Sequence, residues 1–203
     1  MNLIAINGSY RKKGNTTAMI EGVLKGYRDA GGQARHIMLI DHNIKTCLGC
    51  THCFYEKDAA IGTCVHTDDM KSIIESILSA DALIVGSPVY WGNVSSVMAN
   101  FIHRLTPLGY DKSLDGGFKG VPVLKLKPVK PGAIVSSSIA PFPINLLPAY
   151  RVVYGFLKHV LTVTGYRSSF ALRVGGAYMG TPIPERASVR QRAVRIGKGL
   201  SER

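Results

Sequence analysis

Apolar runs and amphipathic stretches alternate along most of the chain. Short runs rich in Leu, Ile, Val and Ala predict buried strands at residues 3–6, 34–39, 82–85, 133–136 and 169–174. Stretches with apolar residues at helical spacing predict helices at residues 15–27, 67–79, 95–105, 150–163 and 183–197. Thr67 is the expected N-cap of the second helix, with Asp68 and Asp69 stabilising its first turn.

Strands that alternate with helices in this way are typical of parallel βαβ units. The sequence therefore predicts an α/β fold, a doubly wound five-stranded parallel sheet with helices on both faces. One domain over residues 1–203 is expected, because single cores divide only beyond roughly 250–300 residues. Residues 107–131 are rich in Gly, Pro and Lys, which predicts an elaborated connection with a short strand at 121–126. Ligands of such sheets bind beyond the carboxyl ends of the strands, so the loops after the first, third and fourth strands are the candidate sites.

The basic charge is concentrated in the second half of the chain. The net charge is +12, yet residues 1–100 contain nine Lys or Arg and nine Asp or Glu, whereas residues 101–203 contain sixteen and four. Such a surface attracts anions of many kinds. A solvated basic surface that also favours an anionic cofactor is the preferred interpretation. Nucleic-acid binding is disfavoured, because no recognised nucleic-acid motif accompanies the charge.

The apolar runs are too short to indicate a membrane protein. No run approaches the roughly 18 apolar residues that a membrane-spanning helix needs. The first residues lack the charged leader and long apolar stretch of a secretion signal. The sequence therefore predicts a cytoplasmic protein without a membrane partner.

The loop after the first strand has the composition of an anion site. It reads Gly-Ser-Tyr-Arg-Lys-Lys-Gly-Asn-Thr-Thr over residues 8–17 and leads into a helix. Glycines permit tight turns, hydroxyls and amides donate hydrogen bonds, and a helix N-terminus attracts a phosphate; Arg11 adds a charged donor. The loop lacks both the Gly-Lys-Ser/Thr ending of a triphosphatase loop and the Gly-x-Gly-x-x-Gly dinucleotide fingerprint. The alternative is that its polar residues only cap the helix.

The loop after the third strand combines aromatic and polar groups. It reads Gly-Ser-Pro-Val-Tyr-Trp-Gly-Asn-Val-Ser over residues 86–95. Tyr90 and Trp91 suit contact with a planar ring, while Asn93 and the backbone amides suit its polar edge. The alternative is a turn whose aromatic side chains pack against the domain.

Four motifs together resemble the flavodoxin-like NAD(P)H-dependent FMN reductases, particularly the branch that contains the iron–sulfur flavoproteins. The motifs are Gly-Ser-x-Arg-x-x-Gly-Asn-Thr at 8–16, Cys-x-Gly-Cys-x-x-Cys at 47–53, Asp-Asp-Met at 68–70 and Gly-Ser-Pro-Val-Tyr-Trp at 86–91. Their order and spacing are more specific than any one of them, and they cover about residues 1–105. The resemblance implies a flavodoxin-like sheet, FMN as cofactor and NAD(P)H as substrate.

The resemblance also assigns residues to the cofactor. The expected FMN phosphate site consists of Ser9, Arg11, Gly14, Asn15, Thr16 and Thr17. The residues expected along the isoalloxazine are Pro88, Val89, Tyr90, Trp91, Gly92 and Asn93. Three residues after the fourth strand are expected to complete the site: Ser136, Ser137 and Ser138. The segment 175–182 is interpreted as a loop beside the flavin or at a subunit contact.

All four cysteines lie close together in the sequence, at Cys47, Cys50, Cys53 and Cys64. Four thiolates at this density can bind a 4Fe-4S cluster, and the iron–sulfur flavoproteins use a compact set in the corresponding loop. The final interval of ten residues is longer than that pattern, which leaves two alternatives. One is zinc with His52 or His66, and the other is free thiols or a redox-active disulfide.

The resemblance implies that FMN performs the chemistry, so no catalytic acid or base is assigned to the protein. Hydride from NAD(P)H would pass to the flavin and the electrons to a flavin, quinone or protein acceptor, through the cluster if one is bound. A homodimer or higher homo-oligomer is expected from the same resemblance. Two alternatives stay open: a flavodoxin-type electron carrier without its own nicotinamide substrate, and a redox-sensing regulatory flavoprotein with an acidic partner.

Overall fold

The computed structural model describes residues 1–54, 62–109, 130–141, 144, 148–178 and 182–202. Within these residues, five strands form one all-parallel sheet in the order β2-β1-β3-β4-β5, which confirms the predicted flavodoxin-like fold. The strands are β1 (Asn2–Asn7), β2 (Gln33–Met38), β3 (Ala82–Pro88), β4 (Lys130–Ser137) and β5 (Tyr166–Val174). The predicted short strand at 121–126 and most of the predicted connection at 107–131 lie outside the described residues.

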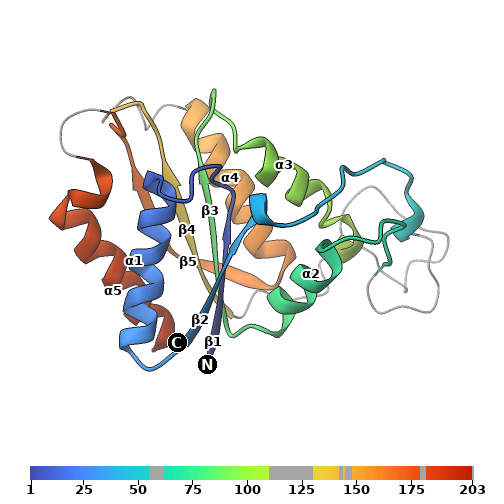
Figure 1. Ribbon diagram of the computed structural model, residues 1–203, viewed down its shortest axis with the longest axis horizontal. Helices are drawn as coiled ribbons and strands as arrows, with labels where there is room; N and C mark the ends of the chain where they lie inside the picture. Colours follow the sequence, from blue (N-terminus) through green and yellow to red (C-terminus); the bar gives the residue numbers. More distant parts are fainter. Residues whose placement is uncertain (55–61, 110–129, 142–143, 145–147, 179–181, 203) are drawn as a thin grey trace.

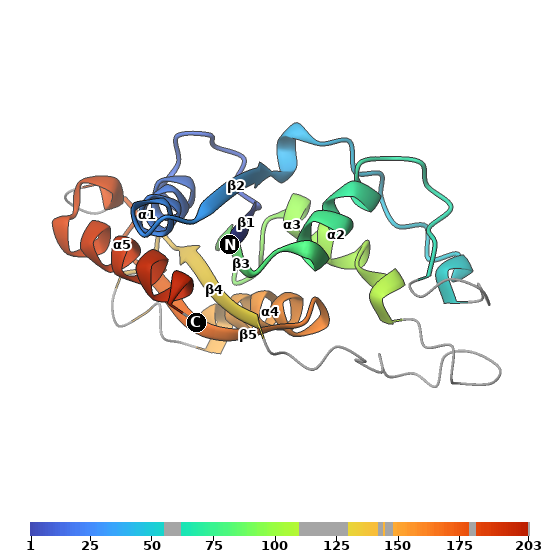
Figure 2. The same ribbon diagram turned by 90° about the horizontal axis from the view of Figure 1, so that it is seen from below.

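Helices cover both faces of this sheet (Figures 1 and 2). They are α1 (Asn15–Asp29), α2 (Met70–Ser79), α3 (Ser96–His103), α4 (Pro148–Val163) and α5 (Ala187–Ser201). On one face, alternate strand residues such as Ile6 and Val85 pack against α2, α3 and α4. On the other, the intervening residues such as Ala5 and Ile84 pack against α1 and α5. Because strand side chains alternate between the two faces of the sheet, they contribute to two separate apolar cores.

The two helices α1 and α5 cross at glycines. A Cβ atom at Gly26 would lie 2.1 Å from the carbonyl oxygen of Val194, and one at Gly197 would lie 2.0 Å from that of Val23. These distances leave no room for a side chain, so the two helix backbones meet directly. This contact fixes α1, whose N-terminus follows the first candidate loop.

Two predicted helix starts are wrong. Thr67 is not the N-cap of α2, because that helix begins at Met70 after Asp69. The carboxylate of Asp68 accepts the amide hydrogen of Met70 at 3.1 Å and thereby takes over part of the capping role. The segment Ile183–Glu185 forms a 3-10 turn, and α5 begins only at Ala187. No helix among the described residues is both long and apolar enough to cross a membrane.

Candidate functional site

The loop between β1 and α1 is ordered by its own polar groups. The Ser9 hydroxyl accepts the amide hydrogen of Arg11 at 3.1 Å and donates to its carbonyl oxygen at 3.2 Å. The same carbonyl accepts the Thr17 hydroxyl at 2.8 Å and the amide of Gly14 at 3.0 Å. The loop therefore turns around the Arg11 carbonyl and brings its start and end together.

Asn7 connects this loop to the sheet. Its side chain is fully buried at the end of β1, and its Oδ1 accepts the amide hydrogen of Ser9 at 2.8 Å. Its Nδ2 donates to the Thr17 hydroxyl at 3.0 Å and lies 3.1 Å from Nε2 of His36, whose Nδ1 is 2.6 Å from a Glu21 carboxylate oxygen. Sequence reasoning assigned no role to Asn7 or His36. Only the side-by-side pairing of β1 with β2 brings these polar groups together.

The N-terminus of α1 faces the space enclosed by this loop. Among the described residues, no side chain caps this helix end, and its first turn contains no acidic residue. Uncompensated amide hydrogens and the helix dipole together favour an anion at such a position. The end of α1 thus has the properties of a phosphate site, and the alternative of a merely capped helix loses its main support.

One pocket joins the β1 loop to the ends of β3 and β4. Its lining consists of Ser9, Arg11, Gly14, Asn15, Thr16, Pro88, Val89, Tyr90, Ser137, Ser138, Ile139, Ala177 and Tyr178. Ten of the residues predicted to bind the cofactor are therefore brought together in space, five from the first loop and five from the other two. The hydroxyls of Thr16 and Ser137 lie 2.8 Å apart and join the first helix directly to the end of β4.

Five predicted cofactor residues lie beside this lining rather than in it: Thr17, Trp91, Gly92, Asn93 and Ser136. Thr17 is buried behind the loop that it stabilises, and Ser136 is buried within β4. Their binding roles stay predictions.

The Trp91 side chain is fully exposed, so it does not pack against the domain as the alternative for this turn expected. Tyr90 and Asn93 exchange two backbone hydrogen bonds of 2.9 Å, and Trp91 and Gly92 between them have φ angles of 49° and 73°. This is the geometry of a tight hairpin turn with two left-handed residues, which directs the tip outward. Gly92 adopts such a φ without cost, whereas Trp91 is strained by it.

The segment after β5 completes the pocket. The guanidinium of Arg11 donates to the Tyr178 hydroxyl at 3.0 Å, and Nδ2 of Asn15 donates to the Ala177 carbonyl at 3.3 Å. The hydrogen bond to Tyr178 raises the pKa of Arg11 above its ordinary value. Ala177 and Tyr178 of this segment therefore line the pocket, and whether the segment also forms a subunit contact stays a prediction. Ile139, in the same lining, was missed because nothing in its sequence context distinguishes it from a core residue.

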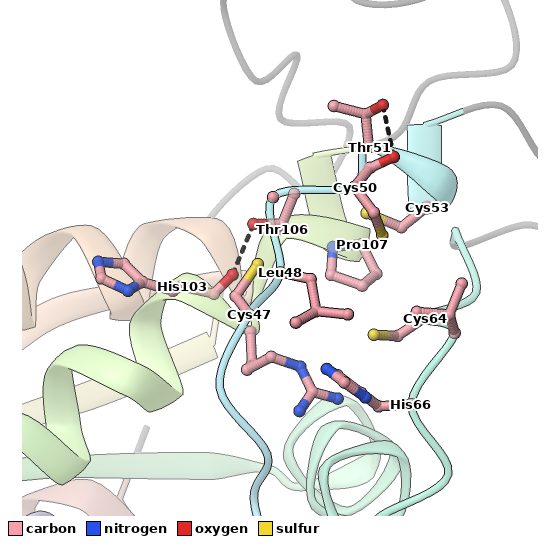
Figure 3. A pocket seen from close by; sticks show the side chains of 13 residues that line it. Cys47, Leu48, Cys50, Thr51, Cys53, Cys64, His66, His103, Thr106 and Pro107 are labelled. Carbon is pink, nitrogen blue, oxygen red and sulfur yellow. Dashed lines mark hydrogen bonds between the residues drawn. The ribbon is translucent and has the colours of Figure 1, made fainter.

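The four cysteines line a second pocket. The chain segments that carry them lie outside the sheet and beyond α2 (Figure 1). Figure 3 shows their side chains around one hollow, with Leu48 and Pro107 between them. This pocket has a volume of about 110 Å³, and its wall also includes His66, His103 and Arg104. All four cysteines are free thiols in the structure.

The thiols do not form a ready ligand set in the described part of the chain, where no group of three or more His, Cys, Asp or Glu side chains is arranged to bind a metal. Burial raises the pKa of the Cys53 thiol to about 11, and repulsion from Cys64 adds to this effect. A metal at this position would therefore have to displace a thiol proton and draw the cysteines together. His66 already uses Nε2, which lies 2.9 Å from the Thr46 carbonyl oxygen, so the imidazole orients the loop.

A buried ion pair lies at the wall of the cysteine pocket. Nη1 of Arg104 is 2.6 Å from Oδ2 of Asp68, and Nη2 is 3.1 Å from Oδ1. Burial disfavours both charges, but their mutual hydrogen bonds outweigh it, so the pKa of Asp68 is lowered and that of Arg104 is raised. Asp68 was predicted to be a structural residue of a helix start, and Arg104 was given no role.

Comparison with known proteins adds to this geometry. A model of the family described as NADPH-dependent FMN reductase matches residues 1–142. The chain belongs to this family. It is 32% identical over 153 residues to an iron-sulfur flavoprotein of Archaeoglobus fulgidus, covering 75% of this chain and 65% of that protein. It is 36% identical over 108 residues to an iron-sulfur flavoprotein of Methanocaldococcus jannaschii, covering 53% of each. The chain thus spans between about half and two thirds of these relatives' length.

Solved structures of several oxidoreductases share the fold of this FMN reductase family member. A flavone reductase matches with a TM-score of 0.68 at 17% identity, covering all of this chain and 62% of the other. An NAD(P)H:quinone oxidoreductase from Methanothermobacter marburgensis matches with a TM-score of 0.65 at 15% identity, covering 98% and 96%. An FMN-dependent NADH-azoreductase from Bacillus anthracis in complex with FMN matches with a TM-score of 0.66 at 15% identity, covering 99% and 97%.

Proposed function

We propose that this protein is an FMN-dependent oxidoreductase that takes hydride from NADH or NADPH and passes electrons to a flavin, quinone or protein acceptor. The observation that supports it most is the single pocket in which an anion-binding loop meets the apolar edge formed by Pro88, Val89 and Tyr90. A phosphate at one end and a planar apolar group at the other are the two halves of FMN. The family match is consistent with this chemistry.

The residues of the pocket divide between the two halves. Ser9, Arg11, Asn15 and Thr16 would bind the phosphate, together with the amides at the start of α1. When bound, FMN supplies the hydride and electron transfer, and the protein supplies binding, orientation and electrostatics. No side chain of the pocket is assigned as an acid or base.

The pocket is open, which bears on the assembly. Its enclosed part has a volume of about 80 Å³ among the described residues. Pockets that bury a whole cofactor usually enclose roughly 300–1,000 Å³. Exposed apolar side chains surround the opening, among them Tyr90, Ile139 and Tyr178, with Trp91 beside them. We propose that the nicotinamide substrate and a second copy of the chain cover this surface, in a homodimer or a higher homo-oligomer.

The cysteine pocket is the proposed site of a 4Fe-4S cluster bound by Cys47, Cys50, Cys53 and Cys64. The donor set fits, because four thiols from two segments line one hollow, and thiolates are the usual ligands of such clusters. A cluster would supply one-electron transfer to or from an outer partner. The two iron-sulfur flavoproteins named above support this assignment.

The phosphate assignment is tested by comparing FMN with riboflavin, which lacks the phosphate. Arg11→Gln is expected to weaken FMN binding about tenfold, because a charge-assisted hydrogen bond is lost. Riboflavin binding should stay unchanged. Lys13→Gln is the matched control, since it removes the same charge from the same loop at an exposed residue outside the lining. Flavin fluorescence quenching measures the affinities of both flavins for the unchanged protein and for each variant.

Equal losses for both flavins, or equal effects of the two substitutions, would contradict the phosphate assignment. The oxidoreductase proposal is then tested by adding NADH or NADPH to FMN-loaded protein without oxygen. Bleaching of the flavin absorption followed by turnover with a quinone supports it. FMN binding without reduction by either nucleotide would favour the electron carrier instead. Iron and sulfide analysis of the same sample should give about four irons per chain if the cluster is present.

A further inference from the structure

Arg104 lies between the core of the fold and the cysteine pocket. It follows the last residue of α3, its side chain is 2% exposed, and it belongs to the pocket wall. Its partner Asp68 has a side chain that is 1% exposed and is not part of that wall. The cationic end of the buried pair therefore faces the thiols, and the anionic end faces away from them.

The carboxylate of Asp68 is satisfied on the side away from the pocket. Besides the guanidinium, it accepts the amide hydrogens of Lys45 at 2.9 Å and Met70 at 3.1 Å. These two backbone amides stabilise the negative charge of the carboxylate by hydrogen bonding. Arg104, by contrast, has a buried Nε without a hydrogen-bond partner among the described residues. The pair is neutral as a whole, but only its cationic member belongs to the wall of the cysteine pocket.

A cation has a particular use at this position. The helix α3 ends at His103, so the negative end of its dipole points toward the pocket wall and disfavours anionic ligands. The pocket wall, among the described residues, contains no Lys and no further Arg. Thiolates are anionic, and a metal group bound by four of them has a net negative charge as a whole. Arg104 is thus the one fixed positive charge that the described wall offers them.

We infer that Arg104, oriented by Asp68, is the counter-charge of the cysteine site: it favours binding of a thiolate-ligated metal group and raises the reduction potential of a cluster bound there. This inference rests on the proposed function of the cysteine pocket. Charge near the sulfurs is one of the means by which a protein sets such a potential, because the reduced cluster is more negative than the oxidised one. Arg104 acts through the field at the ligands and is a positioning residue.

A purely structural role makes a different prediction. Nη1 of Arg104 also donates to the Lys45 carbonyl at 2.6 Å, and Asp68 binds the Lys45 amide, so both side chains fasten the segment that leads to Cys47. If fastening were the whole effect, loss of either side chain would impair the site in the same direction. If charge matters, removing the cation and removing the anion have opposite effects.

The test uses the full chain with Arg104→Gln, Asp68→Asn and Arg104→Lys, each reconstituted with iron and sulfide without oxygen. The midpoint potential is measured by redox titration followed by electron paramagnetic resonance. Arg104→Gln should lower the potential, Asp68→Asn should raise it, and Arg104→Lys should leave it near that of the unchanged protein. In parallel, Co²⁺ is titrated into metal-free protein and followed by its thiolate charge-transfer band. Arg104→Gln should weaken Co²⁺ binding about 10–100-fold, as loss of groups around metal ligands commonly does, while Asp68→Asn should not weaken it.

The outcomes separate this inference from the proposed cluster. Opposite shifts in potential support the inference, whereas shifts in the same direction, or none, overturn it and leave the cluster in place. If no cluster forms in the unchanged protein, the cluster proposal fails, and the Co²⁺ affinities then decide alone. Weaker Co²⁺ binding in Arg104→Gln but not in Asp68→Asn supports the counter-charge. Equal losses of Co²⁺ affinity in the two variants overturn it. If neither iron nor Co²⁺ binds, both proposals are overturned. If one of the other variants does not fold, Arg104→Lys takes its place, because it keeps the charge but loses the bidentate contact with Asp68. A purely structural role then predicts a changed Co²⁺ affinity, whereas the counter-charge role predicts an unchanged one.

Discussion

The two pockets of this protein are built in different ways. The proposed FMN pocket lies at the carboxyl ends of β1, β3 and β4, where the sheet register places Asn7 beside Gly86 and Ser87 beside Ser136. The cysteine pocket, as far as the described residues show, is lined by no strand residue and is formed by segments 47–53, 64–66 and 103–107. One site is thus positioned by the core of the fold, and the other by contacts outside it.

The contacts that fasten the two pockets differ accordingly. In the FMN pocket, the buried amide of Asn7 and the hydroxyls of Ser9 and Thr17 order the loop through uncharged hydrogen bonds. At the cysteine pocket, the buried ion pair of Arg104 and Asp68 orders the chain instead. A phosphate brings its own charge and needs donors, whereas thiolates are part of the chain and need a cation already in place. The two proposed sites therefore differ in construction because the ligand supplies the anion in the first and the protein supplies it in the second.

The two pockets also have features in common. Among the described residues, the non-glycine residues with positive φ are Thr51 and Trp91, one in each loop. Such strain is found preferentially at functional sites. The helix α3 joins the two regions, because Ser95, its N-cap, donates to the Gly8 carbonyl at 2.5 Å, and its other end leads to Arg104. Over its eight residues this helix rises about 12 Å, so one short helix links the loop after β1 to the wall of the cysteine pocket.

The largest expected effect comes from breaking the support of the FMN pocket in the core. Gly26→Ala places a Cβ against the Val194 backbone, so it should reduce the free energy of unfolding by about 3 kcal/mol. Gly155→Ala in α4 is the control, since nothing lies within 4 Å of its new Cβ. That change should stabilise the protein by about 0.5–1 kcal/mol. Urea unfolding measures both, and equal midpoints would refute the direct backbone contact of α1 with α5.

A smaller effect separates the two pockets. Asn7→Ala leaves the Ser9 amide without its acceptor and should cost about 2 kcal/mol of unfolding free energy, together with FMN affinity. Asn100→Ala is the counterpart near the other pocket, where Nδ2 donates to the Ile44 carbonyl at 3.0 Å. It should leave FMN affinity unchanged and weaken Co²⁺ binding instead. Loss of FMN binding in both variants would show that the pockets are not independent.

The buried ion pair at the cysteine pocket should make stability depend on pH. Because the pKa of Asp68 is lower in the folded than in the unfolded protein, the unfolded state takes up the proton first as the pH falls. The ion pair therefore stabilises the fold fully above about pH 4, and this contribution is lost as the pH falls through the lowered pKa. Each unit of lowering corresponds to about 1.4 kcal/mol. The urea midpoint of the unchanged protein should exceed that of Asp68→Asn at pH 7, and this difference should be smaller at pH 3. A difference that is the same at both pH values would contradict the expectation.

The candidate sites could be located from the sequence to different extents. The glycines, hydroxyls and Arg11 of the first loop indicate an anion site by composition alone, and the strand pattern predicts at which edge of the sheet the loop lies. Trp91 could not be placed, because whether a turn points its tip into or away from a pocket depends on two φ angles. Tyr178 is separated from Arg11 by 167 residues, and only the order β4-β5 at the sheet edge brings them together.

The amino-acid sequence by itself determined the alternation of strands and helices, the composition of both loops and the clustering of the cysteines, because these depend on residues near one another in the chain. The tertiary structure decided which side chains share a pocket. Asp68 illustrates this: its neighbours in sequence indicate a helix start, but its buried partner Arg104 is 36 residues away. A local pattern cannot specify such a pair, since the free energy that keeps two charges buried comes from contacts that exist only when α2, α3 and the cysteine loop have packed together.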